Sequence, residues 1–263
     1  MFYFARSFLI PYIIQNKYRF ICEIGASHGY TTDKLLEIED LVVTVIDPCL
    51  DTDLLTKFKN NPRVRIHKGL SLNVLEELSD QFDCILIDGD HNWYTVFNEL
   101  RKIQDRNMIK QEGTIILHDV TWPYGRRDMY YQPETVPQEF KHPYAKMGIL
   151  YGKSALDTAG INSHHHNALY SGGPKNGILT AIEDFLKFSE QNYNFFYIKL
   201  QNGLGFLYRK KGSFCSVSYY KLLLKTICFY NPYTTLKNVI RSQSPGLYAS
   251  LKLLRDAIHS KLT

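Results

Sequence analysis

Short apolar runs rich in β-branched residues alternate with amphipathic stretches between residues 19 and 117. Each stretch between two runs has room for one helix. This alternation predicts parallel strands that are covered by helices and joined in right-handed βαβ units. The expected strands are 20–24, 42–46, 64–67, 84–87 and 114–117, and the expected helices are 31–38, 51–59, 72–78 and 94–104.

The alternation stops in the segment 120–175, which is rich in Pro, Gly, Tyr and Arg. This segment is too long for a simple connection, so we expect an insert that forms a lid or recognises the substrate. Regular structure resumes with an expected helix at 178–190 and expected strands at 195–199 and 204–208, joined as a hairpin around 201–203. The prediction is an α/β fold with about seven strands, mostly parallel, and an antiparallel edge.

The two ends of the chain lie outside this pattern. Residues 1–20 are apolar but are interrupted by charged residues and a proline, and they lack a small-residue cleavage site, which predicts a packing helix. The C-terminal part looks helical and is broken by two prolines. It is interpreted either as an appendage packed on the body or as a helix whose basic face contacts an anionic membrane surface. We expect one domain over 1–209 and an appendage over 210–263.

The net charge of +5 is unevenly distributed along the chain. Residues 210–263 hold nine basic residues and one acid, which leaves a net charge of −3 on the remainder. An acidic body argues against nucleic acid as the substrate. Composition leaves the oligomeric state open, with a homo-oligomer among the options.

The cysteines are odd in number and include no C-x-x-C pair. Such a set favours reduced thiols, and therefore a cytoplasmic location. The five are Cys22, Cys49, Cys84, Cys215 and Cys228.

A glycine-containing loop follows the first expected strand and leads into a helix, which is where an α/β sheet receives a nucleotide-like ligand. Gly25 and Gly29 let the backbone turn sharply and approach a ligand closely. Asp47 ends the second expected strand, where a carboxylate can accept both ribose hydroxyls of an adenosine. Together these features predict a nucleoside site.

The segment 23–29 resembles the first motif of class I S-adenosylmethionine-dependent methyltransferases, an acid followed by two glycines four positions apart. The resemblance implies a Rossmann-like fold, with Glu23 beneath the loop and Asp47 on the ribose. Many family members carry an acid after the third strand that meets the adenine amino group, and that place here holds Leu70 or Ser71. The residues expected to bind the cofactor are Glu23, Gly25, Ala26, Ser27, Gly29, Asp47, Leu70, Ser71 and Asp88.

Other interpretations of the same loop stay open. A dinucleotide site usually has G-x-G-x-x-G, which is absent here. Residues 25–29 also match G-x-S-x-G, the nucleophile elbow of α/β-hydrolases, with Ser27 as nucleophile. That elbow normally follows several strands rather than the first. A non-catalytic scaffold protein that binds a nucleoside, or a glycine turn that binds nothing, would also fit.

Acids and histidines follow the fourth and fifth expected strands. Asp88 and His91 come after the fourth, and His118 and Asp119 after the fifth. Carboxyl ends of neighbouring parallel strands face one crevice, so these side chains are expected to converge beside the cofactor. Such ligands suit magnesium or manganese, and His91 could take a proton from a metal-bound hydroxyl. Alternatively, the acids cap turns and His118 is a half-buried imidazole. Strand alternation predicts that Asp90 points away.

The cluster resembles that of a metal-dependent O-methyltransferase branch of the family, which includes macrolide-sugar methyltransferases. There an Asp-Gly-x-His turn supplies a metal ligand and a base, and a later acidic pair completes the metal shell. The resemblance implies that Asp88, His118 and Asp119 bind metal and that His91 is the catalytic base. His118 replaces an acid of the family pattern, which favours manganese, iron or zinc over magnesium, or a site where metal is not essential.

Aromatic and basic side chains open the insert directly after these residues. Aromatic rings stack on sugars, and paired arginines bind carboxylate or phosphate groups. The residues expected to contact the acceptor are Trp122, Tyr124, Arg126 and Arg127. Alternatively, the aromatic rings pack on the body and the arginines lie on the surface. The sequence as a whole predicts S-adenosylmethionine-dependent methylation of a hydroxyl on a small-molecule or glycan acceptor.

Overall fold

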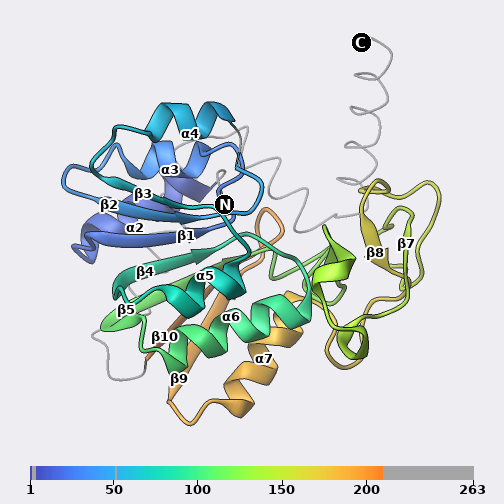
Figure 1. Cartoon of the computed structure of the whole chain (residues 1–263). Helices are drawn as coiled ribbons and strands as arrows, with labels where there is room; N and C mark the ends of the chain where they lie inside the picture. The colour runs from blue at the N-terminus through green and yellow to red at the C-terminus, as the bar shows by residue number, and fades with distance from the viewer. Residues whose placement is uncertain (2–3, 51, 210–263) are drawn as a thin grey trace.

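A seven-stranded sheet forms the centre of the molecule (Figure 1). The computed structural model describes residues 1, 4–50 and 52–209. The strands of the sheet are β1 (Phe20–Ile24), β2 (Val42–Ile46), β3 (Val64–His67), β4 (Phe82–Ile87), β5 (Ile109–His118), β9 (Tyr193–Ile198) and β10 (Leu204–Arg209).

The strand order is β3-β2-β1-β4-β5-β10-β9. The first five strands are parallel, and β10 pairs antiparallel with both β5 and β9. The order reverses between β1 and β4, which makes that junction the topological switch point, where open α/β sheets bind ligands. The chain therefore has the predicted Rossmann-like architecture, with its ligand crevice at the ends of β1 and β4.

Helices cover both faces of the sheet, and each face has its own apolar core (Figure 1). Leu86 and Ile116 pack into one core, and their neighbours Ile85 and Ile115 pack into the other. Because both faces are buried, the strands read as continuous apolar runs. One face carries η1 (Ala5–Leu9), α2 (Ile10–Gln15), α3 (Tyr30–Leu35) and α4 (Thr52–Phe58), and the other carries α5 (Ser71–Glu77), α6 (Trp93–Asp105) and α7 (Ile178–Phe188).

The N-terminal helical segment packs on the sheet, as its apolar pattern predicts. Phe8 is buried against Phe206, and the buried hydroxyl of Tyr12 shares a hydrogen bond of 2.8 Å with that of Thr114. No helix within the described part of the chain is both long and apolar enough to cross a bilayer.

Two predictions about the sheet need correction. Strand β5 begins at Ile109, five positions before the expected start, because the polar residues 110–112 are partly or fully exposed and hide the strand pattern. The antiparallel strand was expected at the edge of the sheet. It is β10, which lies between β5 and the edge strand β9.

The insert forms a lobe beside the sheet (Figure 1). It contains a three-stranded sheet in the order β6-β8-β7 and two short turns of 3-10 helix. Its elements are β6 (Met129–Tyr130), η2 (Pro133–Thr135), η3 (Gln138–Phe140), β7 (Tyr144–Lys146) and β8 (His166–Ala168). The appendage expected over 210–263 lies outside the described residues.

A buried carboxylate, Asp128, attaches the insert to the body. Its Oδ1 accepts hydrogen bonds of 2.7 Å from the backbone N–H groups of Trp93 and Gly177, which begin α6 and precede α7. Its Oδ2 accepts one of 2.9 Å from the Tyr130 hydroxyl. Burial raises the pKa of Asp128 to about 6 although these bonds lower it. Helix N-termini favour a negative charge, so this carboxylate holds both helix starts and the insert together.

Candidate functional site

The loop after β1 lies so close to the loop after β4 that only glycine fits at its start. Gly25 has φ +86°, and a Cβ there would lie 2.4 Å from the carbonyl oxygen of Asp88. Ser27 also has a positive φ, of 50°, a strained conformation of the kind that clusters at functional sites. Gly29 forms the left-handed N-cap of α3. The loop is therefore pressed against the neighbouring strand end at the switch point.

Asp47 joins the loops that follow β1 and β2. Its buried carboxylate accepts a hydrogen bond of 2.8 Å from the Ser27 backbone N–H and one of 2.7 Å from that of Cys49. A carboxylate has about four acceptor sites, so lone pairs remain for two ribose hydroxyls. The residue orders both loops and still offers its oxygens to a ligand.

A cavity of about 270 Å³ opens at this place. Six of the residues expected to bind the cofactor line this cavity, namely Gly25, Ser27, Asp47, Leu70, Ser71 and Asp88. The cavity thus lies between the loops that follow β1, β2, β3 and β4, where the nucleoside was expected.

Three of the expected cofactor residues stand behind the cavity wall. Ala26 is buried and Gly29 is the N-cap of α3, and neither lines the cavity. Glu23 is buried beneath the loop and accepts a hydrogen bond of 2.5 Å from the Thr32 hydroxyl. Burial raises the pKa of Glu23 to about 7. These three residues shape the loop and do not line the cavity.

Several cavity residues were not found by sequence reasoning, and four of them bear on the chemistry of the site. Asp90 was expected to point away, but β4 ends at Ile87, so strand alternation no longer applies and Asp90 lines the cavity, with its Oδ2 accepting from the Thr95 hydroxyl at 3.0 Å. The others, Tyr131, Gln132 and Thr135, come from the insert. Sequence pattern gives no signal for an insert folding back over the cavity.

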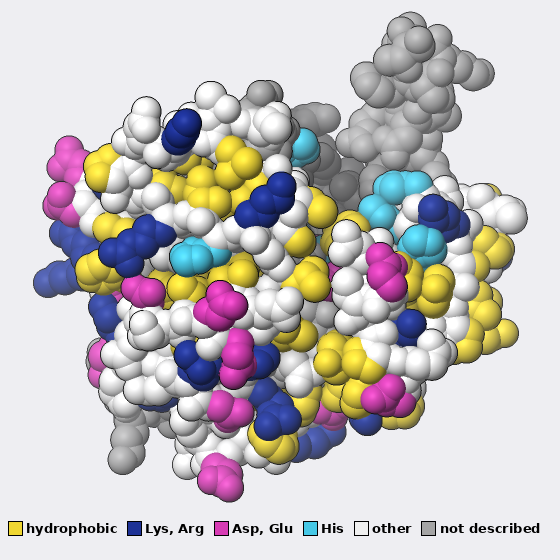
Figure 2. Space-filling view, viewed as in Figure 1, with side chains coloured by type: hydrophobic (Ala, Val, Ile, Leu, Met, Phe, Trp, Pro, Cys, Tyr) yellow, Lys and Arg dark blue, Asp and Glu magenta, His cyan; other side chains and the backbone are white. Residues whose placement is uncertain are grey.

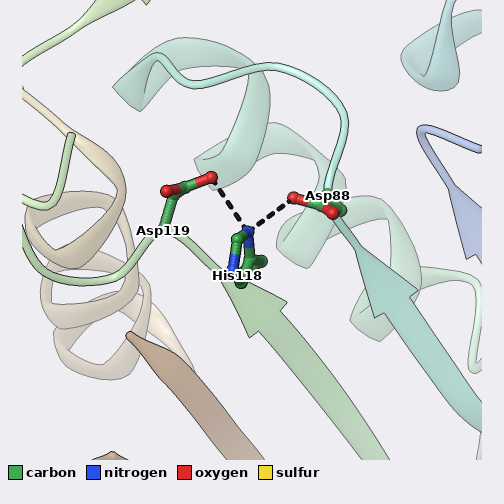
Figure 3. Close-up of side chains that lie close together, drawn as sticks. All are labelled: Asp88, His118 and Asp119. Carbon is green, nitrogen blue, oxygen red and sulfur yellow. Dashed lines mark hydrogen bonds and ion pairs between the residues drawn. The ribbon is translucent and has the colours of Figure 1, made fainter. Parts of the chain in front are cut away.

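Acids and a histidine meet where β4 and β5 end (Figure 3). The Nδ1 atom of His118 lies 2.9 Å from Oδ1 of Asp88 and 2.9 Å from Oδ2 of Asp119. Asp119 has φ 58°, which turns its side chain back toward the strand ends. The structure therefore brings together the three residues expected to bind metal.

The hydrogen bonds of His118 define its protonation. Its Nε2 lies 3.0 Å from the carbonyl oxygen of Gln201, which can only accept, so Nε2 carries a proton. Burial lowers the pKa of His118, but the charges of Asp119 and Asp88 outweigh it and raise that pKa to about 9. The ring is therefore an imidazolium at neutral pH, held by two carboxylates. Sequence reasoning missed Gln201, since only its backbone takes part.

The second oxygen of Asp88 has a different partner. Its Oδ2 accepts a hydrogen bond of 2.5 Å from the Met1 ammonium group. Burial raises the pKa of Asp88, but the Met1 ammonium and His118 oppose this and lower it to about 2. Asp88 is therefore ionised, and both of its oxygens are in use.

His91 forms a buried pair with Asp119 and keeps one ring nitrogen without a partner. Its Nε2 lies 2.8 Å from Oδ2 of Asp119. Within the described part of the chain, neither His91 Nδ1 nor Asp119 Oδ1 has a hydrogen-bond partner, although both atoms are buried. Burial lowers the pKa of His91, but the charge of Asp119, its hydrogen bond and the charge of Asp88 together outweigh burial and raise that pKa. A buried ring with a free nitrogen, oriented by a carboxylate, is the arrangement of a general base.

Of the insert residues expected to contact the acceptor, only some lie near His91. The Tyr124 ring lies edge-on to His91 at 5.2 Å, and its hydroxyl accepts a hydrogen bond of 2.9 Å from Asn162. Half-buried Trp122 packs edge-on against Tyr151. Aromatic rings thus stand near the candidate base.

The two arginines are engaged elsewhere. Arg126 forms two hydrogen bonds of 2.6 Å with Glu183 on α7. Arg127 is buried, and its guanidinium donates to the carbonyl oxygens of Ala168 and Ser154. Both side chains stabilise the insert, and neither is brought to the cavity. Figure 2 shows charged side chains of both signs interspersed on the face in view and histidines exposed on the insert lobe.

A buried glutamate on α6, Glu99, predicts a pH dependence of stability. Burial raises its pKa from 4.5 to about 8, so the folded chain keeps a proton that the unfolded chain loses. Stability should therefore fall as pH rises from about 4.5 to about 8, by about 3 kcal/mol at pH 7 from this group. The free energy of unfolding is measured with urea between pH 5 and 8. Glu99→Gln should remove this group's part of the decrease, whereas Glu77→Gln, at an exposed position, should not. Equal pH slopes in Glu99→Gln and the native chain would contradict this.

Residues 22–120 match a family described as a methyltransferase domain. No curated protein matches the sequence.

Solved structures with a similar fold include three methyltransferases. A Podospora anserina methyltransferase bound to S-adenosylhomocysteine is 15% identical, with 77% of this chain and 76% of that chain covered and a TM-score of 0.48. A Bacillus cereus O-methyltransferase in complex with S-adenosylhomocysteine is 15% identical, with 78% and 80% covered and a TM-score of 0.46. The O-methyltransferase TomG of Streptomyces achromogenes, involved in tomaymycin synthesis and in complex with S-adenosylmethionine, is 14% identical, with 77% and 78% covered and a TM-score of 0.45.

The family match begins in β1 and ends just after β5, so it covers the parallel strands and most of the residues that line the cavity.

Proposed function

We propose that this chain transfers the methyl group of S-adenosylmethionine to a hydroxyl group of a sugar or glycan. One observation carries the proposal: a cavity at the switch point lies beside a buried His91–Asp119 pair with a free ring nitrogen. The family match to a methyltransferase domain supports the same conclusion.

The cofactor roles follow from the cavity wall. Gly25, Asp47, Leu70 and Ser71 line the cavity. Gly25 would leave room for the methionine part, Asp47 would accept from the ribose, and Leu70 and Ser71 would border the adenine. When bound, S-adenosylmethionine supplies an electrophilic methyl group on a positively charged sulfur. The protein holds donor and acceptor in line, and such alignment supplies a large part of the rate enhancement of two-substrate reactions.

The base role belongs to His91. Its Nδ1 takes the proton of the acceptor hydroxyl, while Asp119 fixes the ring through Nε2 and stabilises the imidazolium that forms. Tyr124 and Tyr131 pack edge-on against this ring and limit its movement. Proton removal makes the oxygen nucleophilic where the methyl group is presented.

Residues of the acid and histidine cluster fit a divalent metal. Asp88, His118 and Asp119 offer ligand atoms within 4.8 Å of one another, and Asp119 Oδ1 is buried without a partner in the described chain. The His118 Nε2–H bond to a carbonyl oxygen is the orientation common in metal-binding histidines. A bound ion would lower the pKa of an acceptor hydroxyl. His118 would first have to give up its Nδ1 proton, and one oxygen of Asp88 would have to exchange its present partner for the ion.

The environment of His91 favours an uncharged acceptor. Aromatic rings surround the base, and such rings stack on sugars. Arg126 and Arg127, the expected partners of a carboxylate or phosphate, are held by Glu183 and by backbone carbonyls instead. A sugar hydroxyl therefore fits better than an anionic group.

Titration calorimetry with S-adenosylmethionine tests the proposal. The native chain should bind it, and Asp47→Ala should weaken binding by about tenfold or more, since each charge-assisted hydrogen bond contributes about 1.5–3 kcal/mol. Asp157→Ala, on the insert surface, serves as control. Absence of binding by the native chain would overturn the function, and S-adenosylhomocysteine release in an acceptor screen separates an enzyme from a scaffold protein.

The metal is tested by titrating Mn²⁺ and following the signal of the free ion by electron paramagnetic resonance. The native chain should remove free Mn²⁺ from solution, Asp119→Asn should bind at least about tenfold more weakly, and Asp157→Asn should behave like the native chain. If Asp119→Asn bound Mn²⁺ as well as the native chain does, the metal would have to be assigned elsewhere.

The hydrolase interpretation has no support in the site. The backbone N–H of Ser27 donates a hydrogen bond to Asp47. The two buried histidines of the site, His91 and His118, bond to acids rather than to this serine. A Ser-His pair within hydrogen-bond reach is what such an enzyme needs.

We propose a cytoplasmic location on the basis of the thiols. Cys22 and Cys84 are free and buried on adjacent strands, where they face opposite cores. Cell fractionation would test this, and recovery from an oxidising compartment would contradict it.

A further inference from the structure

Tyr131 stands between the cofactor cavity and the candidate base. It lines the cavity, and its ring lies 5.7 Å from the His91 ring at an interplanar angle of 72°. No other residue on the cavity wall has a ring contact with His91 among the described residues. Tyr131 therefore lies at the border between the space for the donor and the space for the acceptor.

The backbone that carries Tyr131 is fixed to His91 itself. The Met129 N–H donates a hydrogen bond of 3.0 Å to the carbonyl oxygen of His91, and Tyr130 is held by Asp128. Met129 and Tyr130 are each only 1% exposed, whereas Tyr131 is 52% exposed. The ring thus projects from a rigid support into open space, and much of its surface is available to a ligand.

The proposed reaction places a changing charge beside this ring. The C–S bond of the donor breaks and its electron pair stays on sulfur, a C–O bond forms to the acceptor, and the hydroxyl proton goes to His91. The sulfur is positively charged before transfer and neutral afterwards. Because the methyl group must reach an oxygen beside His91, the sulfur of a bound donor would lie on the Tyr131 side of the cavity.

Aromatic faces attract cations, and the attraction is stronger away from bulk water. We propose that the Tyr131 ring binds the sulfonium of S-adenosylmethionine and thereby selects the charged donor over the neutral product S-adenosylhomocysteine. This inference rests on the proposed function and adds a specificity residue from the insert. The ring rather than the hydroxyl carries the effect, since the hydroxyl has no hydrogen-bond partner among the described residues.

Calorimetry with both ligands tests the inference on four proteins: the native chain, Tyr131→Phe, Tyr131→Leu and Tyr170→Leu. Tyr170 is 65% exposed on the same insert and is absent from the cavity wall, so its variant is the matched control. Tyr131→Leu should bind S-adenosylmethionine about 3- to 10-fold more weakly and S-adenosylhomocysteine with unchanged affinity. Tyr131→Phe and Tyr170→Leu should keep the native ratio of the two affinities.

Two results would overturn the inference while leaving the function intact. Equal weakening of both ligands in Tyr131→Leu would mean that the ring only packs on the cofactor, and unchanged affinity for both would mean that it does not touch the sulfur. If the native chain bound neither ligand, the function would fail first. Thermal melting of each variant shows whether it is folded, and the side chain at 131 is exposed enough for leucine to be tolerated.

Discussion

Replacement of His91 by alanine is expected to lower turnover by about 100- to 10,000-fold, the usual contribution of a positioned base. The physical reason is that Nδ1 of His91 is a buried ring nitrogen without a partner in the described chain, while Nε2 is fixed by Asp119. Affinity for S-adenosylmethionine should change little, because His91 is not on the cavity wall. Turnover is measured as release of S-adenosylhomocysteine with an acceptor found by screening.

The matched control is His164→Ala, at an exposed histidine of the insert. It should retain native turnover. If His91→Ala kept native turnover with unchanged cofactor affinity, His91 would not be the base, and the free nitrogen would need another explanation. A parallel loss of turnover and cofactor affinity would instead indicate a disturbed fold around Met129, which bonds to the His91 backbone.

Gly25→Ala is expected to weaken cofactor binding by at least about 30-fold. A left-handed residue with a side chain costs about 1–2 kcal/mol, and the new Cβ would lie 2.4 Å from the Asp88 carbonyl oxygen and 2.5 Å from the Gly89 Cα. The neighbour is backbone at the end of β4, so the loop itself must move. Calorimetry gives the affinity, and thermal melting gives the loss of stability.

Gly152→Ala separates the two causes. Gly152 has φ +81°, close to that of Gly25, but nothing lies within 4 Å of an added Cβ. This control therefore carries the conformational cost alone and should leave cofactor binding unchanged. Native affinity in Gly25→Ala would show that the loop after β1 can move away from β4 without consequence, and it would remove the structural basis of the donor site.

The sheet was predictable from sequence wherever burial on both faces produced an apolar run. The bounds of β1, β2 and β3 agree with the expected strands because their residues are flanked by turns and loops. The start of β5 was missed, since Lys110, Gln111 and Glu112 lie where the strand leaves the core. Hydrophobic pattern reports burial, and it does not report backbone pairing at a solvated strand end.

The acid and histidine cluster could be predicted because parallel strands place their carboxyl ends together. That argument needs only the strand order, and it brought Asp88, His118 and Asp119 to one place. The partners that tune these groups come from far along the chain through backbone atoms, as with the Gln201 carbonyl. No side-chain pattern encodes such contacts.

The insert was the least predictable part. Arg126 and Arg127 are a typical anion-binding pair in sequence. In the structure, however, Arg126 bonds to Glu183, and Arg127 is buried and donates to backbone carbonyl oxygens. Tyr131, whose sequence context is unremarkable, reaches the cavity instead. Which of several aromatic or basic residues faces a ligand depends on tertiary packing that local sequence does not determine.

Asp128 has a consequence for how this chain could diversify. Its carboxylate accepts a hydrogen bond from the Gly177 N–H, and its own N–H donates a hydrogen bond of 2.7 Å to Asn176 Oδ1. The insert therefore leaves the body and returns to it at the same place. Residues of the insert beyond Thr135, the last that lines the cavity, could be lengthened, shortened or exchanged without disturbing the strands beneath. The choice of acceptor could then evolve through changes in this part of the insert, while the residues that bind the methyl donor stay the same.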